Sequence, residues 1–381
     1  MRITNAKQNV ESRMVAASLR GLATLAASFA ALLGVVAIPG SARGVDLVRY
    51  WEKNAQGVVE ERTAQGETLG VDPNGVAMNC ESEDVAPDEN PIPSERVLWV
   101  QYDAAPIELS AARVETEVGN YEEALEKLNS IAPEDVDPDS MPLIAAEAAW
   151  YKAYATLNLA LLGAGDLKEG GAEMTRFVQQ YPTSYRYYEG CRLLGDAFYA
   201  YAQSAAKDSS AFVKRAEGAY GSLLKADSDS VKARGKLGLG RLALAADDVE
   251  KAKTYFQEVV DMDAFDVEKS EARIGLARAT SKEGDHAGAL ALLNALLAET
   301  PDDATLRHAR IYNAIGDVSV VADRLQEAAV AYLHVDLLYP QARTERVAAL
   351  KALVGVWKEL GREDRAIETE RRLRERFHVQ P

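Results

Sequence analysis

The stretch LGRLALAADDVEKAKTYF, residues 239–256, sets Gly240 twelve positions before Ala252, with Phe256 four positions after that alanine. Alanines in this setting recur along the chain at steps of 36, 37, 39 and 38 residues: Ala216, Ala252, Ala289, Ala328 and Ala366. The small residue twelve positions earlier is repeated as Ala277 and Gly316, and more weakly as Val354. A period of this length is typical of a solenoid built from pairs of helices.

The residue types of these copies give the repeat a physical reason. Small side chains late in one helix and early in the next let two helix backbones approach closely where they cross. A larger side chain four residues after the alanine then fills the next layer, as at Tyr220, Phe256, Leu293 and Tyr332. Because proline cannot continue a helix, the ends of second helices are predicted at Pro182, Pro301 and Pro340.

The turns between paired helices carry a more specific signal. Gly119-Asn120-Tyr121 and Gly284-Asp285-His286 are similar to the Gly-Asp-Tyr turn of the tetratricopeptide repeat (TPR). Leu239-Gly240 matches the Leu-Gly element of that repeat, and Ala252 with Phe256 matches its Ala-x3-Phe element. Residues 106–381 therefore resemble a TPR solenoid. The resemblance implies a mainly α fold, with about seven helical hairpins in a right-handed superhelix.

The chain departs from the usual repeat in three ways. The tryptophan that often opens the repeat is absent, and the spacing exceeds the usual 34 residues. The last copy carries Glu370 among several arginines, which is typical of the polar helix that caps a solenoid.

Residues 177–184, FVQQYPTS, resemble a junction common in TPR proteins of the bacterial envelope, including outer-membrane assembly and cell-division coordinating factors.

Residues 45–105 have a different texture. Short β-prone runs, such as residues 97–102 (VLWVQY), are separated by turn signals, and Asn74-Gly75 is a strong hairpin signal. Four or five strands are predicted, which suits a small β-rich module of the SH3-like or Sm-like type. Such modules precede helical repeats in some exported bacterial proteins. A partly ordered linker with one or two hairpins is the alternative.

Residues 1–42 have the pattern of an export signal. Arg13 and Arg20 precede an uncharged apolar run, residues 21–38, and residues 39–42 (PGSA) supply a helix breaker and small residues suited to cleavage. The run of 18 residues is also just long enough to span a bilayer. We expect a signal peptide or a retained signal anchor, and a protein that is periplasmic, secreted or anchored to the inner membrane.

The composition argues against several classes of function. A formal net charge of −16 disfavours general affinity for nucleic acid or for an anionic membrane surface. The sequence lacks the Gly-rich phosphate loop, the nucleophile elbow and the zinc-protease motif. Its two cysteines, Cys80 and Cys191, have no metal-ligand spacing and no spacing that supports a disulfide between them. We predict no catalytic residue, no cofactor and no metal site.

The candidate binding site is a face of the first helices. In TPR proteins these helices line a concave groove that often holds a peptide. The corresponding face carries Arg192, Arg234, Arg241, Arg278, Lys282, Arg310, Asn313, Lys351 and Lys358. It also carries five carboxylates: Glu189, Asp196, Glu271, Asp317 and Glu359. One interpretation is a net positive groove that captures a carboxylate, an acidic peptide or an anionic glycan. The other is a solvated face of exposed ion pairs.

The predicted function combines the resemblance with the absence of catalytic motifs. We expect a non-enzymatic scaffold or adaptor that mediates protein–protein interactions in the cell envelope. Its partner would be a protein or peptide, an acidic one being an option, and not nucleic acid. It would meet a membrane only through an uncleaved N-terminal segment. The alternative is a binding protein for a small anionic ligand or glycan in the groove of the repeats.

Overall fold

The computed structural model of the chain describes residues 45–53, 59–80, 82–204, 209–377 and 379. Residues Gly44 to Pro381 form one compact unit that holds both the strands and the helices. The predicted signal peptide or anchor, residues 1–42, lies outside the described residues. Within those residues, no helix combines the length and the apolar character that crossing a bilayer requires.

The N-terminal part of this unit is one antiparallel sheet. Its strands are β1 (Asp46–Lys53), β2 (Val59–Asp72), β3 (Gly75–Cys80), β4 (Ile92–Pro93) and β5 (Val97–Gln101), in the order β4-β3-β2-β1-β5. In the hairpin of β2 and β3, Asp72 pairs with Gly75, and the Asp72 carboxylate accepts hydrogen bonds from the N–H groups of Asn74 and Gly75. The predicted β-rich character of this segment is confirmed, with its hairpin at the predicted turn, whereas its SH3-like or Sm-like type stays a prediction.

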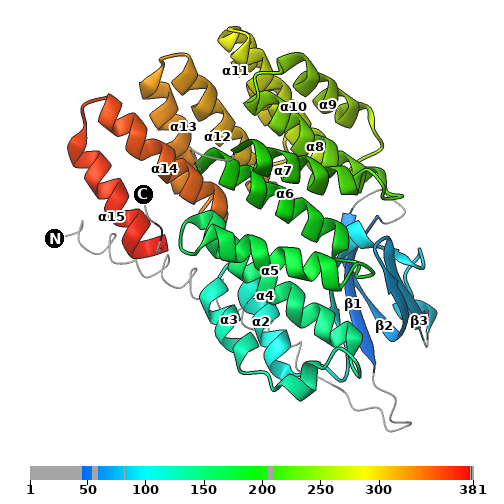
Figure 1. Ribbon diagram of the computed structural model, residues 1–381. Helices are drawn as coiled ribbons and strands as arrows, with labels where there is room; N and C mark the ends of the chain where they lie inside the picture. The colour runs from blue at the N-terminus through cyan, green and yellow to red at the C-terminus, as the bar shows by residue number, and fades with distance from the viewer. Residues whose placement is uncertain (1–44, 54–58, 81, 205–208, 378, 380–381) are drawn as a thin grey trace, which may run out of the picture. The chain divides into compact units, whose positions relative to one another are not determined.

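Fourteen α-helices follow in the described residues and pair into seven antiparallel hairpins (Figure 1). They are α2 (Ile107–Glu117), α3 (Tyr121–Asn129), α4 (Pro142–Leu162), α5 (Leu167–Gln180), α6 (Tyr187–Ser204), α7 (Ser209–Leu223), α8 (Asp229–Ala245), α9 (Val249–Asp261), α10 (Asp266–Lys282), α11 (His286–Glu299), α12 (Thr305–Val321), α13 (Leu325–Leu338), α14 (Arg343–Glu359) and α15 (Glu363–Phe377). Even-numbered helices are the first of each hairpin. The hairpins stack in the predicted superhelical arrangement.

The helix ends follow the turn chemistry. Asp166, Asp248 and Asp285 each accept a hydrogen bond from a backbone N–H in the first turn of α5, α9 and α11. Gly284 precedes α11 with a φ of 94°, a conformation that glycine adopts without strain. As predicted, α5, α11 and α13 each end two residues before a proline, namely Pro182, Pro301 and Pro340.

The glycine of the repeat faces an aromatic ring rather than the alanine of the next helix. A Cβ added to Gly240 would lie 2.6 Å from the ring of Phe256, and one added to Gly316 would overlap the ring of Tyr332. The sequence predicts small residues where the helices cross, and this is confirmed. Their purpose is to make room for the large side chain four positions after the alanine.

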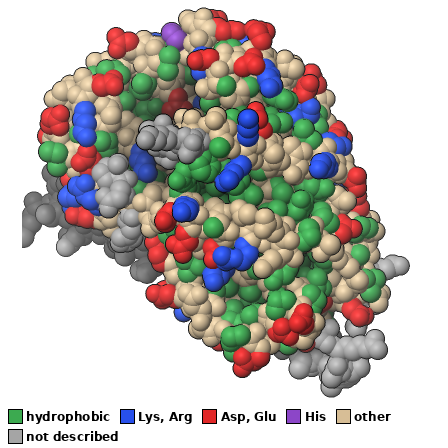
Figure 2. Space-filling model, in the orientation of Figure 1, with side chains coloured by type: hydrophobic (Ala, Val, Ile, Leu, Met, Phe, Trp, Pro, Cys, Tyr) green, Lys and Arg blue, Asp and Glu red, His purple; other side chains and the backbone are tan. Residues whose placement is uncertain are grey.

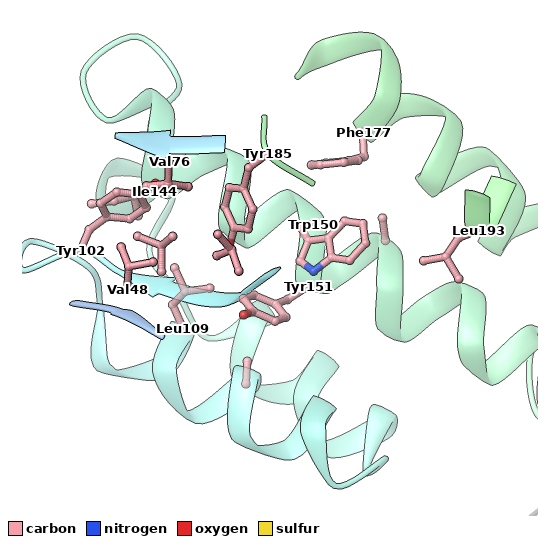
Figure 3. Packing of buried hydrophobic residues seen from close by; sticks show 14 of the residues in the cluster. Val48, Val76, Tyr102, Leu109, Ile144, Trp150, Tyr151, Phe177, Tyr185 and Leu193 are labelled. Atoms are coloured by element: carbon pink, nitrogen blue, oxygen red, sulfur yellow. The ribbon is translucent and has the colours of Figure 1, made fainter. Parts of the chain in front are cut away.

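The sheet and the first helices share a hydrophobic core (Figure 3). Val48 and Val76 of the sheet belong to the same buried cluster as Leu109 of α2 and Ile144 of α4. Arg186, just before α6, adds a polar tie, because its Nη2 donates a 2.8 Å hydrogen bond to the carbonyl oxygen of Leu98. Its guanidinium also lies 5.1 Å from the centre of the Trp150 ring. These contacts fix the sheet against the solenoid.

The last hairpin, α14 and α15, packs against α3 and α4 of the first two hairpins. Buried residues of α14 and α15 share one cluster with Tyr121 of α3 and with Leu159 and Leu162 of α4. Lys351 Nζ donates a hydrogen bond of 3.3 Å to the carbonyl oxygen of Leu162. The helices of this unit therefore close on themselves, a feature that the repeat pattern did not predict.

Candidate binding site

Side chains from five first helices, α6, α8, α10, α12 and α14, line one cavity of about 510 Å³. We call it the inner chamber. Six of the nine predicted site residues lie on it: Arg192, Arg234, Arg241, Arg278, Arg310 and Asn313. Apolar side chains, including Leu237, Phe256 and Ile274, complete the lining. These six residues, which the repeat pattern placed on one face, therefore lie close together in the structure.

The other three predicted residues lie elsewhere. Lys282 donates to the carbonyl oxygen of Leu244 at 2.6 Å and pairs with Asp247. Lys351 lies in the seam where α14 meets α4, and burial lowers its pKa. Lys358 pairs with Glu370 of α15 at 2.8 Å. These lysines stabilise contacts between elements of the fold and do not line the chamber.

The arginines contributed by α6 and α8 are held in ion pairs. Arg192 contacts Glu189 at 2.7 Å and Asp196 at 2.5 Å. Arg241 contacts the other oxygen of Asp196 at 3.0 Å. Arg234 donates to Glu268 of α10 at 2.8 Å. Neighbouring first helices are therefore joined through their charged side chains.

The same pattern continues in α10, α12 and α14. Arg310 contacts Glu271 at 3.0 Å and Glu345 at 3.2 Å, so it bridges α10 and α14. Asn313 Nδ2 donates to Glu345 at 2.9 Å, and Arg278 contacts Asp317 at 2.7 Å. The sequence analysis did not place two of these carboxylates on the site, namely Glu268 and Glu345, which lie in the first turns of α10 and α14. Acidic residues at helix starts are usually explained by the helix dipole.

The balance of charge corrects the net positive interpretation of this face. Five guanidiniums, of Arg192, Arg234, Arg241, Arg278 and Arg310, meet six carboxylates, of Glu189, Asp196, Glu268, Glu271, Asp317 and Glu345. Four of these carboxylates line the chamber, and Asp196 and Asp317 lie next to it. Among the described residues, each arginine of the chamber is therefore neutralised by a carboxylate partner.

The pKa values show how strongly these groups interact. Burial alone would raise the pKa of Glu189, but the guanidiniums of Arg192 and Arg234 outweigh it and lower this pKa to about 2. Burial alone would lower the pKa of Arg310, but the carboxylates of Glu271 and Glu345 outweigh it and raise this pKa. These side chains are therefore charged at neutral pH.

Two tyrosines of second helices orient carboxylates next to the chamber. Tyr220 of α7 donates a 2.7 Å hydrogen bond to Asp196, and Tyr332 of α13 donates one of 2.8 Å to Asp317. Each of these aspartates directly follows a glycine, Gly195 or Gly316, at which an added Cβ would overlap the same tyrosine ring. In both hairpins the first helix therefore supplies both the space for the ring and the acceptor of its hydroxyl.

Two buried acceptors on the chamber have no hydrogen-bond donor within the described part of the chain. These atoms are Glu268 Oε2 and Asn313 Oδ1, in side chains that are 3% and 7% exposed. A buried acceptor without a donor is costly, so a bound group that supplies N–H or O–H donors would be stabilised there. Among the described residues, no group of His, Cys, Asp and Glu side chains is arranged to hold a metal ion.

Comparison with known proteins agrees with this fold. A family model described as a tetratricopeptide repeat matches residues 202–267 and 237–304. No curated protein matches the chain.

Three solved structures illustrate the similarity. A thermophilic TPR protein of Thermus thermophilus is 19% identical, over 55% of this chain and 97% of that one, with a TM-score of 0.41. A tetratricopeptide repeat protein of Parabacteroides merdae is 14% identical, over 70% and 91%, with a TM-score of 0.45. A Rap protein complexed with Competence and Sporulation Factor is 14% identical, over 70% and 75%, with a TM-score of 0.46.

Proposed function

Because the chain is a tetratricopeptide repeat protein, we propose that it is a non-catalytic scaffold or adaptor that binds a segment of a protein partner in the inner chamber. The observation that carries this proposal is the chamber itself. Its five first helices line about 510 Å³, and within the described residues Glu268 Oε2 and Asn313 Oδ1 have no donor. Repeat solenoids characteristically use such inner surfaces for binding.

A peptide suits the chemistry of this surface. Its backbone N–H groups can donate to the two unpaired acceptors, and its carbonyl or carboxylate oxygens can accept from arginines. Arg241 and Arg278 are the best placed for this, because their side chains remain 43% and 39% exposed. An acidic partner would have to compete with Asp196 and Asp317 for these two arginines. The chamber therefore favours a segment that carries both donors and acceptors.

The cell envelope is the proposed location of this function. The support is the pattern of residues 1–42, in which basic residues precede an apolar run and a small-residue stretch. The mass of the full-length gene product purified from its own cells tests this. A mature chain beginning after Ala42 supports export by a cleaved signal, whereas an intact chain in the membrane fraction supports an anchor. An intact chain in the cytosol would exclude both.

Crosslinking in the cells that make the protein, followed by mass spectrometry, tests the scaffold. The wild-type chain is compared with Arg241→Glu/Arg278→Glu, and with Lys214→Glu/Lys225→Glu, a control with the same charge change at exposed positions outside the chamber. We expect a stoichiometric partner that is lost only from the chamber variant. A partner that both variants retain would exclude the chamber as its binding site.

A binding protein for a small anionic ligand or glycan is the second candidate. The observation in its favour is that Arg241 and Arg278 face the chamber with exposed side chains. Ligand binding to the native state raises its stability, so a thermal-shift screen with soluble carboxylates and sugars separates the two. A shift with a soluble compound, together with no crosslinked protein, would favour this candidate.

A further inference from the structure

A second surface lies on the second helices, away from the inner chamber. It is a groove of about 650 Å³ between α5 and α7, with the end of α6 between them, and we call it the outer groove. Figure 2 shows hydrophobic side chains at the surface over α5, α6 and α7, with Lys and Arg side chains among them. None of its lining residues belongs to the inner chamber.

The floor of the outer groove is aromatic. Phe212 of α7 lies 4.2 Å from Tyr201 and 6.3 Å from Phe198 of α6, measured between ring centres. Both phenylalanines line the groove and are only partly buried. Partly exposed aromatic side chains next to one another are a feature of sites that hold an apolar anchor of a partner.

The groove has free space because α5 is small at this place. Gly171 and Ala172 line it, and a Cβ added to Gly171 would meet no atom within 4 Å. Glycine in the middle of a helix lowers helix stability. At Gly171 it leaves room that no side chain of the described residues fills.

The rim of the groove is basic. Its lining includes Lys168, Arg176 and Arg215 but, among the described residues, no aspartate or glutamate. Arg176 pairs with Glu173 at 2.5 Å. Arg215 lies 5.4 Å from the centre of the Phe212 ring, and neither it nor Lys168 Nζ has a carboxylate partner in the described part of the chain. In the inner chamber, by contrast, every arginine has a carboxylate partner.

We propose that the outer groove docks a protein segment with an aromatic or aliphatic anchor flanked by carboxylates. The anchor would enter the space beside Gly171 against the aromatic floor, and the carboxylates would pair with Lys168 and Arg215. Since neither cation has a carboxylate partner among the described residues, an acidic segment can pair with both without breaking an ion pair seen there. The net charge of −16 opposes approach to an anionic membrane and leaves a protein segment as the occupant. This extends the proposed scaffold function at a separate surface.

Fluorescence anisotropy with the full chain tests this proposal. The probe is a fluorescein-labelled peptide with a central tryptophan and leucine flanked on each side by two aspartates. We expect saturable binding that weakens at least about tenfold in Lys168→Glu/Arg215→Glu and in Gly171→Leu. Lys214→Glu, an exposed position on the same helix as Arg215, and Gly218→Leu, where an added Cβ also meets nothing, are the matched controls and retain binding.

Several results would overturn the proposal. These are no binding at millimolar peptide, equal loss in the controls, or equal binding of a peptide with lysines in place of the aspartates. Binding to phosphatidylglycerol vesicles that depends on Lys168 and Arg215, without peptide binding, would assign the groove to a lipid surface instead. Arg241→Glu/Arg278→Glu is expected to bind the peptide normally. A failure at the outer groove is thereby distinguished from a failure of the inner chamber.

Discussion

Nη1 of Arg343 in α14 donates a 2.7 Å hydrogen bond to the carbonyl oxygen of Gly119, which lies 224 residues earlier in the turn between α2 and α3. This contact joins the last hairpin to the first. Lys351 donates to Leu162 of α4 in the second hairpin, and buried residues of α3, α4, α14 and α15 share one apolar cluster. Because the seam links the two ends of the solenoid, it restrains the spacing of the first helices that line the inner chamber.

Breaking this seam should release the two ends without unfolding the middle of the chain. Val379 is fully buried and faces Gly163 at the end of α4, so Val379→Asp places an unpaired charge there, at a cost of about 2–4 kcal/mol. We expect faster amide hydrogen exchange in α3 and α15, with unchanged exchange in α9. Leu338→Asp, at a residue 58% exposed, is the control. Unchanged exchange in α3 would show that the seam contributes no stability.

Adding a Cβ at Gly316, which faces the ring of Tyr332, should lower the stability of the protein. Gly316→Ala forces the ring of Tyr332 to shift, and we expect a loss of about 1–3 kcal/mol in the free energy of unfolding. Gly355→Ala, on the exposed face of α14 where an added Cβ meets nothing, should instead be neutral or stabilising by about 0.5–1 kcal/mol. Urea unfolding of the two variants measures both values. Equal stability would mean that the ring moves freely.

The two cysteines should differ in reactivity. Both are free, but Cys191 is 3% exposed and burial raises its pKa to about 11. Cys80 is only partly buried. Because the thiolate is the reactive form, we expect maleimide at pH 7.5 to label Cys80 at least about tenfold faster than Cys191, with both labelled in urea. Cys80→Ser should abolish the fast phase. Two missing labels in unfolded, unreduced protein would instead indicate a disulfide.

The repeat pattern predicted the helical part of the chain well because the contacts that produce the pattern lie within single hairpins. Gly240, Ala252 and Phe256 lie within one hairpin, so their spacing records the contact that they make. The prolines after α5, α11 and α13 act on their own helices in the same way. The closing contact of Arg343 with Gly119 joins residues from opposite ends of the solenoid, and no spacing within a repeat encodes such a pair.

The candidate site was predicted in part for a related reason. The helical period placed Arg192, Arg241 and Arg310 on one face, and they do line one chamber. Their charge partners come from other hairpins, as with Glu268 for Arg234 and Glu345 for Arg310. The helical period predicts which face of its helix a side chain lies on. It does not predict which residue of another hairpin that side chain contacts. The outer groove was missed because Phe198, Phe212 and Gly171 come from three helices and share no motif.

The ion pairs of the inner chamber should make stability depend on pH through Glu189. Its folded pKa of about 2 lies below the ordinary value of 4.5. Its contribution is therefore present above about pH 4.5 and is lost as the pH falls toward 2. Allowing for solvent screening, we expect Glu189→Gln to lower the free energy of unfolding by about 2 kcal/mol at pH 6. Urea unfolding should show this difference shrinking steadily between pH 4.5 and pH 3, values chosen from that window. Glu217→Gln, at an exposed position of α7, should leave stability unchanged throughout. A difference for Glu189→Gln that stayed constant down to pH 3 would show that the loss comes from packing and not from the charge that Arg192 and Arg234 stabilise.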